Sequence, residues 1–195
     1  MIRLPRLRKS AASNITEPVV RLLARTKVTP SMLTWLGFAI TVGAAVLIAR
    51  GWLFVGGIVI LIAGFFDMLD GALARYTNQV TRFGAFLDST LDRVSEAILL
   101  ISVLLWYIIK PSALIIVLVA VALISSQLVS YIRSRAEGLG FECAVGIFTR
   151  PERVIVLAVG LLVGQVAIAL VIIIVFSLVT IGQRTHHVWK NIKAE

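Results

Sequence analysis

The chain has 195 residues, of which 59% are hydrophobic and only 15% are charged, and its formal net charge is +9. A soluble globule of this length needs more polar side chains to cover its surface, so the composition excludes that class and indicates a membrane protein. The positive charge does not indicate nucleic-acid binding, because the basic residues are scattered between apolar runs without aromatic residues on which bases could stack. The single cysteine, Cys143, has no partner for a disulfide within the chain.

Residues 15–26 are predicted to form an amphipathic helix. Its apolar face consists of Ile15, Val19, Leu22 and Leu23. The charged side chains lie largely elsewhere, which suits a helix that lies in the plane of the lipid headgroups. We therefore expect an interfacial segment at the N-terminus, over residues 1–28.

Apolar segments that can cross a hydrocarbon core of about 30 Å follow along the chain. The first four are residues 32–49, 53–66, 97–109 with its upstream turns, and 112–129. Residues 154–182 are a further run of 29 nearly uninterrupted apolar residues. One helix of that length would measure about 44 Å, which is too long for the bilayer without strong tilt. We therefore expect two short spans here, with a turn near Gly164 and Gln165.

Together these elements predict an all-α integral membrane protein with six transmembrane helices, preceded by the interfacial helix. We expect one domain over residues 1–195, with a six-helix bundle at 29–185 and a tail at 186–195. Lys and Arg accumulate in cytoplasmic loops. Of the 19 Lys and Arg residues, only Arg50 and Lys110 lie in the short gaps after the first and third spans. This distribution predicts that both termini and the polar loops lie on the cytoplasmic side of the plasma membrane.

Five of the ten acidic residues fall between positions 67 and 96, within or at the ends of two predicted spans. An aspartate at the centre of a membrane helix costs about 2.5 to 3.5 kcal/mol, so something must compensate these charges. Asp67 and Asp70 are spaced i, i+3, and Asp88 and Asp92 are spaced i, i+4, so each pair shares a helical face. If the two helices are neighbours in an antiparallel hairpin, as their short connection suggests, the four carboxylates converge. Such an oxygen-only cluster favours Mg²⁺, Mn²⁺ or Ca²⁺.

The residues around the carboxylates point to phosphate chemistry. A metal can neutralise the charge of a transferring phosphate, while a carboxylate takes the proton of the nucleophile. Gly71 and Gly84 allow close approach of a ligand phosphate, and Arg75 and Arg82 border the site. Two alternative roles for the acids stay open: they stabilise the bundle by pairing with Arg75, Arg82 and Arg93, or they line an ion or proton pathway.

The acidic residues belong to a longer pattern. The pattern is Asp67-x2-Asp70-Gly71-x2-Ala74-Arg75-x8-Gly84-x3-Asp88-x3-Asp92. At every fixed position it resembles the signature of the CDP-alcohol phosphotransferase family. The resemblance implies a homodimeric membrane transferase that moves a phospho-lipid group from a CDP-activated lipid onto an alcohol. It also implies that Asp67, Asp70 and Asp88 hold divalent metal, as one or two ions of Mg²⁺ with Mn²⁺ as the alternative, and that Asp92 is both a metal ligand and the catalytic base.

The same resemblance implies a site for the CDP-lipid. Its residues are Gly71, Arg75, Thr81 and the turn that enters the first span, Ser31, Met32, Leu33 and Thr34. A glycine leaves room for the nucleotide, and the planar donor fork of an arginine fits a phosphate. Without a ligand, Ser31 and Thr81 are equally well suited to be the N-caps of the helices that follow them.

Three further segments resemble those of the bacterial phosphatidylinositol-phosphate synthases within the family. They are residues 126–137, 150–153 and 182–184. The resemblance implies that Arg133, Arg153 and Arg184 bind the phosphate of the acceptor, an inositol phosphate, and that the donor is CDP-diacylglycerol or CDP-archaeol. Glycerol phosphate is the alternative acceptor, because the stretch from Pro151 to Arg184 is short for this subgroup. The alternative role of the arginines is that of cytoplasmic anchors at helix ends.

Overall fold

The computed structural model describes residues 17–192, and all regular secondary structure in this range is helical, which confirms the all-α prediction. A short helix over residues 17–23 precedes six longer ones. These are α2 (Pro30–Ala49), α3 (Leu53–Tyr76), α4 (Arg82–Ile109), α5 (Ala113–Gly138), α6 (Arg150–Leu162) and α7 (Val166–Ile192).

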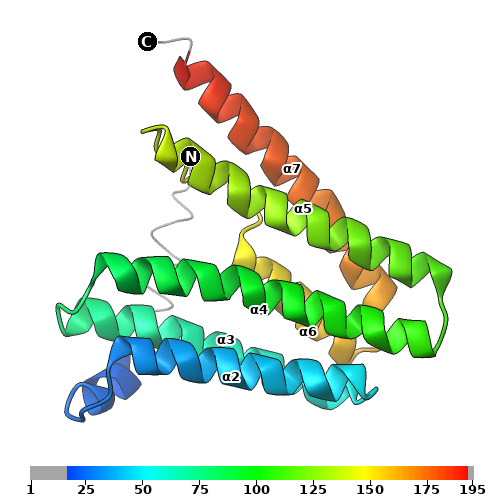
Figure 1. The fold of residues 1–195 in the computed structure, drawn as a ribbon, viewed down its shortest axis with the longest axis horizontal. Coiled ribbons are helices and arrows are strands. Elements are labelled where there is room, and N and C mark those ends of the chain that lie inside the picture. Colours follow the sequence, from blue (N-terminus) through cyan, green and yellow to red (C-terminus); the bar gives the residue numbers. More distant parts are fainter. Residues whose placement is uncertain (1–16, 193–195) are drawn as a thin grey trace.

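The helices form two groups whose axes are inclined to each other (Figure 1). In the first group α2 packs against both α3 and α4, and in the second α5 packs against α7. The two groups are joined by contacts of α4 with α5, and by the short α6, which packs against both α3 and α7. The N-terminal ends of α2 and α4 and the C-terminal ends of α3, α5 and α7 point toward the same end of the bundle, on the left in Figure 1. The apolar core therefore draws residues from every one of these helices.

The expected close packing of α3 on α4 is wrong. The two helices are joined by the short segment 77–81, but each packs on α2, and they make at most sparse contact with each other. Small residues of α2, including the buried Gly37, Ala44 and Ala45, allow two helices to approach it closely. The acidic faces of α3 and α4 therefore do not pack directly on each other, and a cleft opens between them.

Threonine caps start three of the helices that form the site. The hydroxyl of Thr29, and not that of Ser31, accepts a hydrogen bond from the backbone N–H of Met32 (3.3 Å) and caps α2. Thr81 caps α4 by accepting from the N–H of Gly84 (2.9 Å), which confirms the predicted N-cap at this position. Thr149 begins α6 in a capping box with Glu152. The first turn of α6 is therefore fixed in direction.

Four of the described helices, α2, α3, α5 and α7, are long and apolar enough to cross a membrane. α6 has only 13 residues, and α4 carries several charged residues in its first half. The predicted turn near Gly164 is confirmed, since Gly164 adopts a positive φ of 70° between α6 and α7. Two helices follow each other there, as expected, but they differ in length: α6 has 13 residues, whereas α7 has 27 and continues to Ile192, past the expected end of the bundle at 185.

The helix at residues 17–23 packs on the bundle. Val20 is buried in a small apolar cluster with Leu33, Leu69 and Leu73, whereas Leu22 is exposed. The helix thus turns one apolar residue, Val20, toward the protein and another, Leu22, toward its surroundings. Residues 1–16 and 193–195, which include most of the predicted interfacial segment and the end of the tail, lie outside the described residues.

Candidate active site

The four aspartates lie at one end of the bundle on α3 and α4. Asp70 is only 4% exposed, and its Oδ2 accepts a hydrogen bond from the hydroxyl of Thr34 on α2 (2.6 Å). Its other oxygen accepts from the backbone N–H of Gly71. One turn away, α2 contributes Gly37, where an added Cβ would lie 2.9 Å from Oδ1 of Asp67. α2 therefore supports both acids of α3 from behind.

Arg150, the first residue of α6, joins the acids of the two helices. Its Nη1 lies 2.6 Å from Oδ2 of Asp67 and also forms an ion pair with Oδ1 of Asp92. The side chain of Arg150 is largely buried, and its Nε has no hydrogen-bond partner. One guanidinium thus compensates acids from α3 and α4 at once. Sequence reasoning did not assign Arg150 to the site, because local spacing gives no sign of a partner 83 residues away.

The alternative in which the acids pair with Arg75, Arg82 and Arg93 does not describe this arrangement. Within residues 17–192, none of these three arginines forms an ion pair with the aspartates. Arg93 instead hydrogen-bonds α5, where its Nη2 donates to the hydroxyl of Ser134 (2.6 Å). The positive charge that pairs with Asp67 and Asp92 comes instead from Arg150 of α6.

The carboxylates offer the right donors for a hard cation, because all of them are oxygens. As the side chains lie, no three acidic, histidine or cysteine residues of the described chain are close enough together to hold a metal ion. Arg150 supplies the positive charge between Asp67 and Asp92. The donor set thus fits a divalent cation, and Arg150 is the group that such a cation would replace.

A cleft of about 570 Å³ opens between α3 and α4; we call it the α3–α4 cleft. Of the residues predicted to bind CDP-lipid, those that line it are Ser31, Thr34, Gly71, Arg75 and Thr81. Met32 and Leu33 do not line it, since Met32 is exposed elsewhere and Leu33 is buried in the apolar cluster beneath α2. Asp70 and Asp88 also line the cleft. It therefore brings five of the seven predicted residues together beside two carboxylates.

Gly71 lies beside the guanidinium of Arg75 in this cleft. An added Cβ at Gly71 would lie 3.3 Å from Nη1 of Arg75, which is closer than ordinary packing allows. Among the ion pairs of the described residues none involves Arg75. Its guanidinium is therefore available to an anion, and the absence of a side chain at Gly71 leaves it room.

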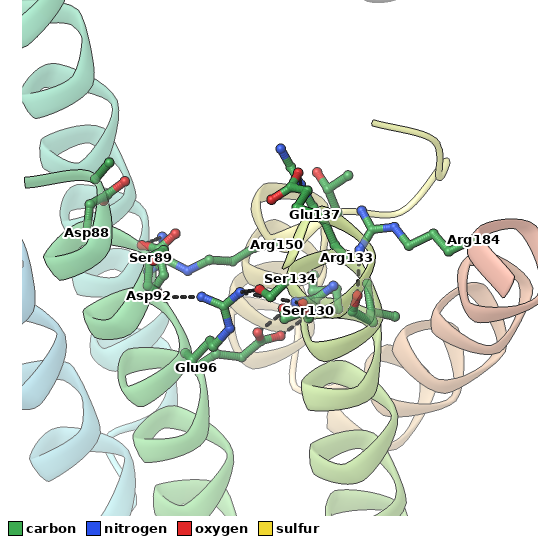
Figure 2. Close-up of a pocket in the computed structure, with 15 residues that line it drawn as sticks. Asp88, Ser89, Asp92, Glu96, Ser130, Arg133, Ser134, Glu137, Arg150 and Arg184 are labelled. Carbon is green, nitrogen blue, oxygen red and sulfur yellow. Dashed lines mark hydrogen bonds and ion pairs between the residues drawn. The ribbon is translucent and has the colours of Figure 1, made fainter. Parts of the chain in front are cut away.

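A second cavity of about 470 Å³ lies between α4, α5, α6 and α7; we call it the arginine cavity. Five arginines line it: Arg93, Arg133, Arg150, Arg153 and Arg184. Figure 2 shows Asp88, Asp92 and Glu96 along α4 on one side, with Arg133 on α5 and Arg184 on α7 opposite them. The structure thus brings together all three arginines predicted to bind the acceptor.

The three predicted arginines are held in different ways. Arg133 is half-exposed and pairs with Glu137 one turn along α5 (2.8 Å). Arg184 is buried, and it donates from Nε to the carbonyl of Val145 (2.9 Å) and from Nη1 to that of Val129 (2.5 Å). Arg184 thereby ties the segment before α6 to α5, so it has a structural task besides any role in binding.

Arg153 makes the most buried ion pair of the site. Its Nε and Nη2 donate to the two carboxylate oxygens of Glu96 on α4, at 2.5 and 2.7 Å. Glu96 was noted as one of the acids of the region but was not predicted to belong to the site. No short-range pattern marks it, because its partner lies 57 residues later.

The α3–α4 cleft and the arginine cavity meet. Ala85 and Asp88, one turn apart on α4, line both of them. A group bound in the cleft and a group bound in the cavity can therefore approach each other beside Asp88. Asp92, the next acid along α4, lies on the side of the arginine cavity.

The fold and site together define an α-helical membrane protein with an acidic centre between two spaces that are each lined by arginine. Residues 27–183 match the family model of the CDP-alcohol phosphatidyltransferases, and the chain belongs to that family. This confirms the resemblance that the signature predicted.

The relatives extend over nearly the whole chain. The chain is 37% identical to the phosphatidylinositol phosphate synthase of Mycobacterium tuberculosis, over 98% of this chain and 93% of that one. It is 38% identical to the archaetidylinositol phosphate synthase of Methanothermobacter thermautotrophicus, over 83% of each chain.

Solved structures of one of these relatives have a fold similar to that of this chain. The crystal structure of the Mycobacterium tuberculosis phosphatidylinositol phosphate synthase with CDP-DAG bound superposes with a TM-score of 0.80 at 36% identity, over 90% of this chain and 94% of that one. The structure of the same synthase in complex with manganese and citrate gives a TM-score of 0.80 at 36% identity, over 89% of this chain and 88% of that one.

Proposed function

We propose that this chain is a phosphatidylinositol-phosphate synthase, which transfers the lipid-bearing phosphate of a CDP-lipid to an inositol phosphate and releases CMP. The observation that carries the proposal is the junction of the α3–α4 cleft with the arginine cavity at Asp88. A two-substrate transfer needs two binding spaces whose contents meet at one reacting centre. The relatives are named phosphatidylinositol phosphate synthase and archaetidylinositol phosphate synthase, and one of their structures has CDP-DAG bound, which agrees with this arrangement.

The donor is assigned to the α3–α4 cleft. Arg75 offers its planar guanidinium to the diphosphate, and Gly71 leaves space for it. Thr81 and Ser31 add hydroxyls at the rim of the cleft. Because the cleft lies at the end of the apolar helices α2 and α3, the acyl or isoprenoid chains can extend along the bundle into the bilayer. Both CDP-diacylglycerol and CDP-archaeol satisfy this geometry.

The acceptor is assigned to the arginine cavity. A phosphate dianion is favoured where several arginines converge, since charge-assisted hydrogen bonds are stronger than neutral ones. Arg133 and Arg153 have donors for it, and Arg184 completes the wall. The acceptor hydroxyl then lies near Asp92, which we assign as the base that takes its proton. The oxygen of that hydroxyl attacks the lipid-bearing phosphorus, and the bond from this phosphorus to the oxygen of CMP breaks.

Divalent metal is assigned to Asp67, Asp70, Asp88 and Asp92, as two Mg²⁺ ions with Mn²⁺ as the alternative. Bound there, metal would supply neutralisation of the negative charge on the diphosphate. The manganese in a related synthase supports this choice. The acids themselves are kept in place by Thr34 and by the close packing at Gly37.

The membrane setting is part of the proposal. We infer six spans, with α4 and α6 completing the four apolar ones, because each of these two packs against two other helices of the bundle and contributes polar residues to the site. The basic residues near the active end of the bundle support an orientation in the plasma membrane in which that end and both termini face the cytoplasm. The assembly is inferred to be a homodimer, as the family resemblance implies.

The test is an assay of the purified protein in mixed micelles with CDP-diacylglycerol or CDP-archaeol and Mg²⁺. The candidate acceptors are inositol phosphate, inositol, glycerol phosphate and glycerol, and the readouts are CMP and the new lipid. We expect product with inositol phosphate and little with unphosphorylated alcohols. Product with glycerol phosphate alone would replace the acceptor assignment, and no CMP with any acceptor would overturn the proposed reaction.

A further inference from the structure

The ion pair between Glu96 and Arg153 is buried to an unusual degree. Glu96 is 5% exposed and Arg153 is 2% exposed, and the two side chains connect α4 to α6 through a bidentate contact. Removing two charges from water costs much of the energy that their attraction returns, and an apolar pair of similar volume often stabilises a fold as well or better. Stability alone therefore does not account for charges at these positions.

The geometry of the pair fixes the guanidinium. Nε and Nη2 of Arg153 each donate to one oxygen of Glu96, so the plane and the rotation of the group are both determined. Nη1 is buried and has no hydrogen-bond partner. Arg153 therefore keeps unused N–H donors in a defined position while it lines the arginine cavity.

Three other cations of this cavity, Arg133, Arg150 and Arg184, are held differently. Arg150 is engaged by Asp67 and Asp92, and Arg184 donates to backbone carbonyls. Arg133 pairs with Glu137 at a half-exposed position, where solvent weakens the contact. Of these arginines, Arg153 is the one that pairs with a buried carboxylate outside the four signature aspartates, that of Glu96. That carboxylate holds the guanidinium without belonging to the acid cluster between α3 and α4.

We propose that Glu96 is a positioning residue for the acceptor. Its carboxylate holds Arg153 so that the remaining N–H donors of the guanidinium face the phosphate of the incoming alcohol, an inference that rests on the proposed function of the arginine cavity. A donor that is already oriented loses little freedom when the phosphate binds. Glu96 thus acts on acceptor affinity through Arg153 and does not contact the reacting atoms.

The first experiment compares Glu96→Gln and Glu96→Asp with the unaltered protein in the micelle assay. Glu96→Gln weakens the hydrogen bonds that hold Arg153. We expect the KM for inositol phosphate to rise about tenfold, which corresponds to the loss of one charge-assisted hydrogen bond. The KM for CDP-lipid should change less than about twofold. Glu96→Asp keeps the charge but shortens the reach, so it should give an intermediate acceptor KM. Glu17→Gln, which breaks the exposed ion pair with Arg21 outside both spaces, is the control and should leave both KM values unchanged.

A purely structural role predicts a different pattern. Both KM values would then rise together, or neither would change, while the Tm falls; either result for Glu96→Gln overturns the positioning role. If Glu96→Gln does not yield folded protein, Glu96→Asp decides: an acceptor KM that rises while the donor KM does not supports the proposal, and an unchanged acceptor KM overturns it.

The double variant Glu96→Met with Arg153→Leu separates this inference from the proposed function. It removes the whole buried pair in favour of an apolar one. If it keeps the normal acceptor KM, Arg153 does not bind the acceptor, and the assignment of the arginine cavity fails. If the double variant loses acceptor affinity but Glu96→Gln keeps it, that assignment stands and only the positioning role of Glu96 fails.

Discussion

Nη1 of Arg150 lies 2.6 Å from Oδ2 of Asp67 on α3 and also pairs with Asp92 on α4, so the first residue of α6 bridges two helices that scarcely touch each other. The contact places a protein cation among the carboxylates that we assign to divalent metal. It follows that Arg150 and metal compete for the same charges.

This competition can be measured by thermal unfolding of Arg150→Gln with EDTA and with Mg²⁺. Removing one partner from a partly buried ion pair costs about 1 to 3 kcal/mol, so the Tm in EDTA should fall. Because the freed acids repel one another, Mg²⁺ should raise the Tm of the variant more than that of the unaltered protein. Arg21→Gln, which breaks an exposed pair with Glu17, is the control. Equal Mg²⁺-induced shifts in the two proteins would show that Arg150 and metal do not share a site.

Asp92→Asn tests the assignment of the catalytic base. The amide cannot take a proton from the acceptor hydroxyl, so CMP release should fall at least about 10²-fold. Since Asp92 lines the arginine cavity and not the α3–α4 cleft, binding of CDP-lipid, measured by calorimetry in micelles, should be retained. Normal turnover in the variant contradicts the assignment.

Gly37→Ala tests the support that α2 gives to Asp67. The added Cβ would lie 2.9 Å from Oδ1 of that aspartate, so the carboxylate or the helix must shift. We expect a higher Mg²⁺ concentration for half-maximal activity and a lower Tm. Gly43→Ala on the same helix is the matched control, because its Cβ would meet nothing within 4 Å. It should be neutral or slightly stabilising, by about 0.5 to 1 kcal/mol. An identical Mg²⁺ requirement in both variants would rule out the support.

Gly71→Ala tests the donor site. Its Cβ would lie 3.3 Å from Nη1 of Arg75, so that guanidinium would have to shift by a few tenths of an ångström. The KM for CDP-lipid should rise several-fold, while the KM for inositol phosphate stays within about twofold, since neither residue lines the arginine cavity. Gly64→Ala, also on α3 and with open space around its Cβ, is the control. If the KM for inositol phosphate rises and the KM for CDP-lipid does not, the assignment of the donor to the α3–α4 cleft is wrong.

Local spacing was sufficient to predict the helices and much of the site. The i, i+3 and i, i+4 spacing of the four aspartates follows from the helical repeat, which does not depend on tertiary structure. The turn at Gly164 was also predictable, because one helix over the whole apolar run would be too long for a bilayer. The lengths of α6 and α7 could not be predicted in the same way. No change in composition marks the residue at which α7 ends.

The sequence by itself determined the family, the helical fold and the identity of the acids, because these depend on composition and on residues close together in the chain. Only the tertiary structure decided that α3 and α4 are held apart on α2, that Arg150 bridges Asp67 and Asp92, and that Glu96 grips Arg153. Those partners are 57 to 83 residues apart. Which of the many charged residues meet across such distances depends on how the helices pack, and that is settled by the burial of apolar surface along all of them at once.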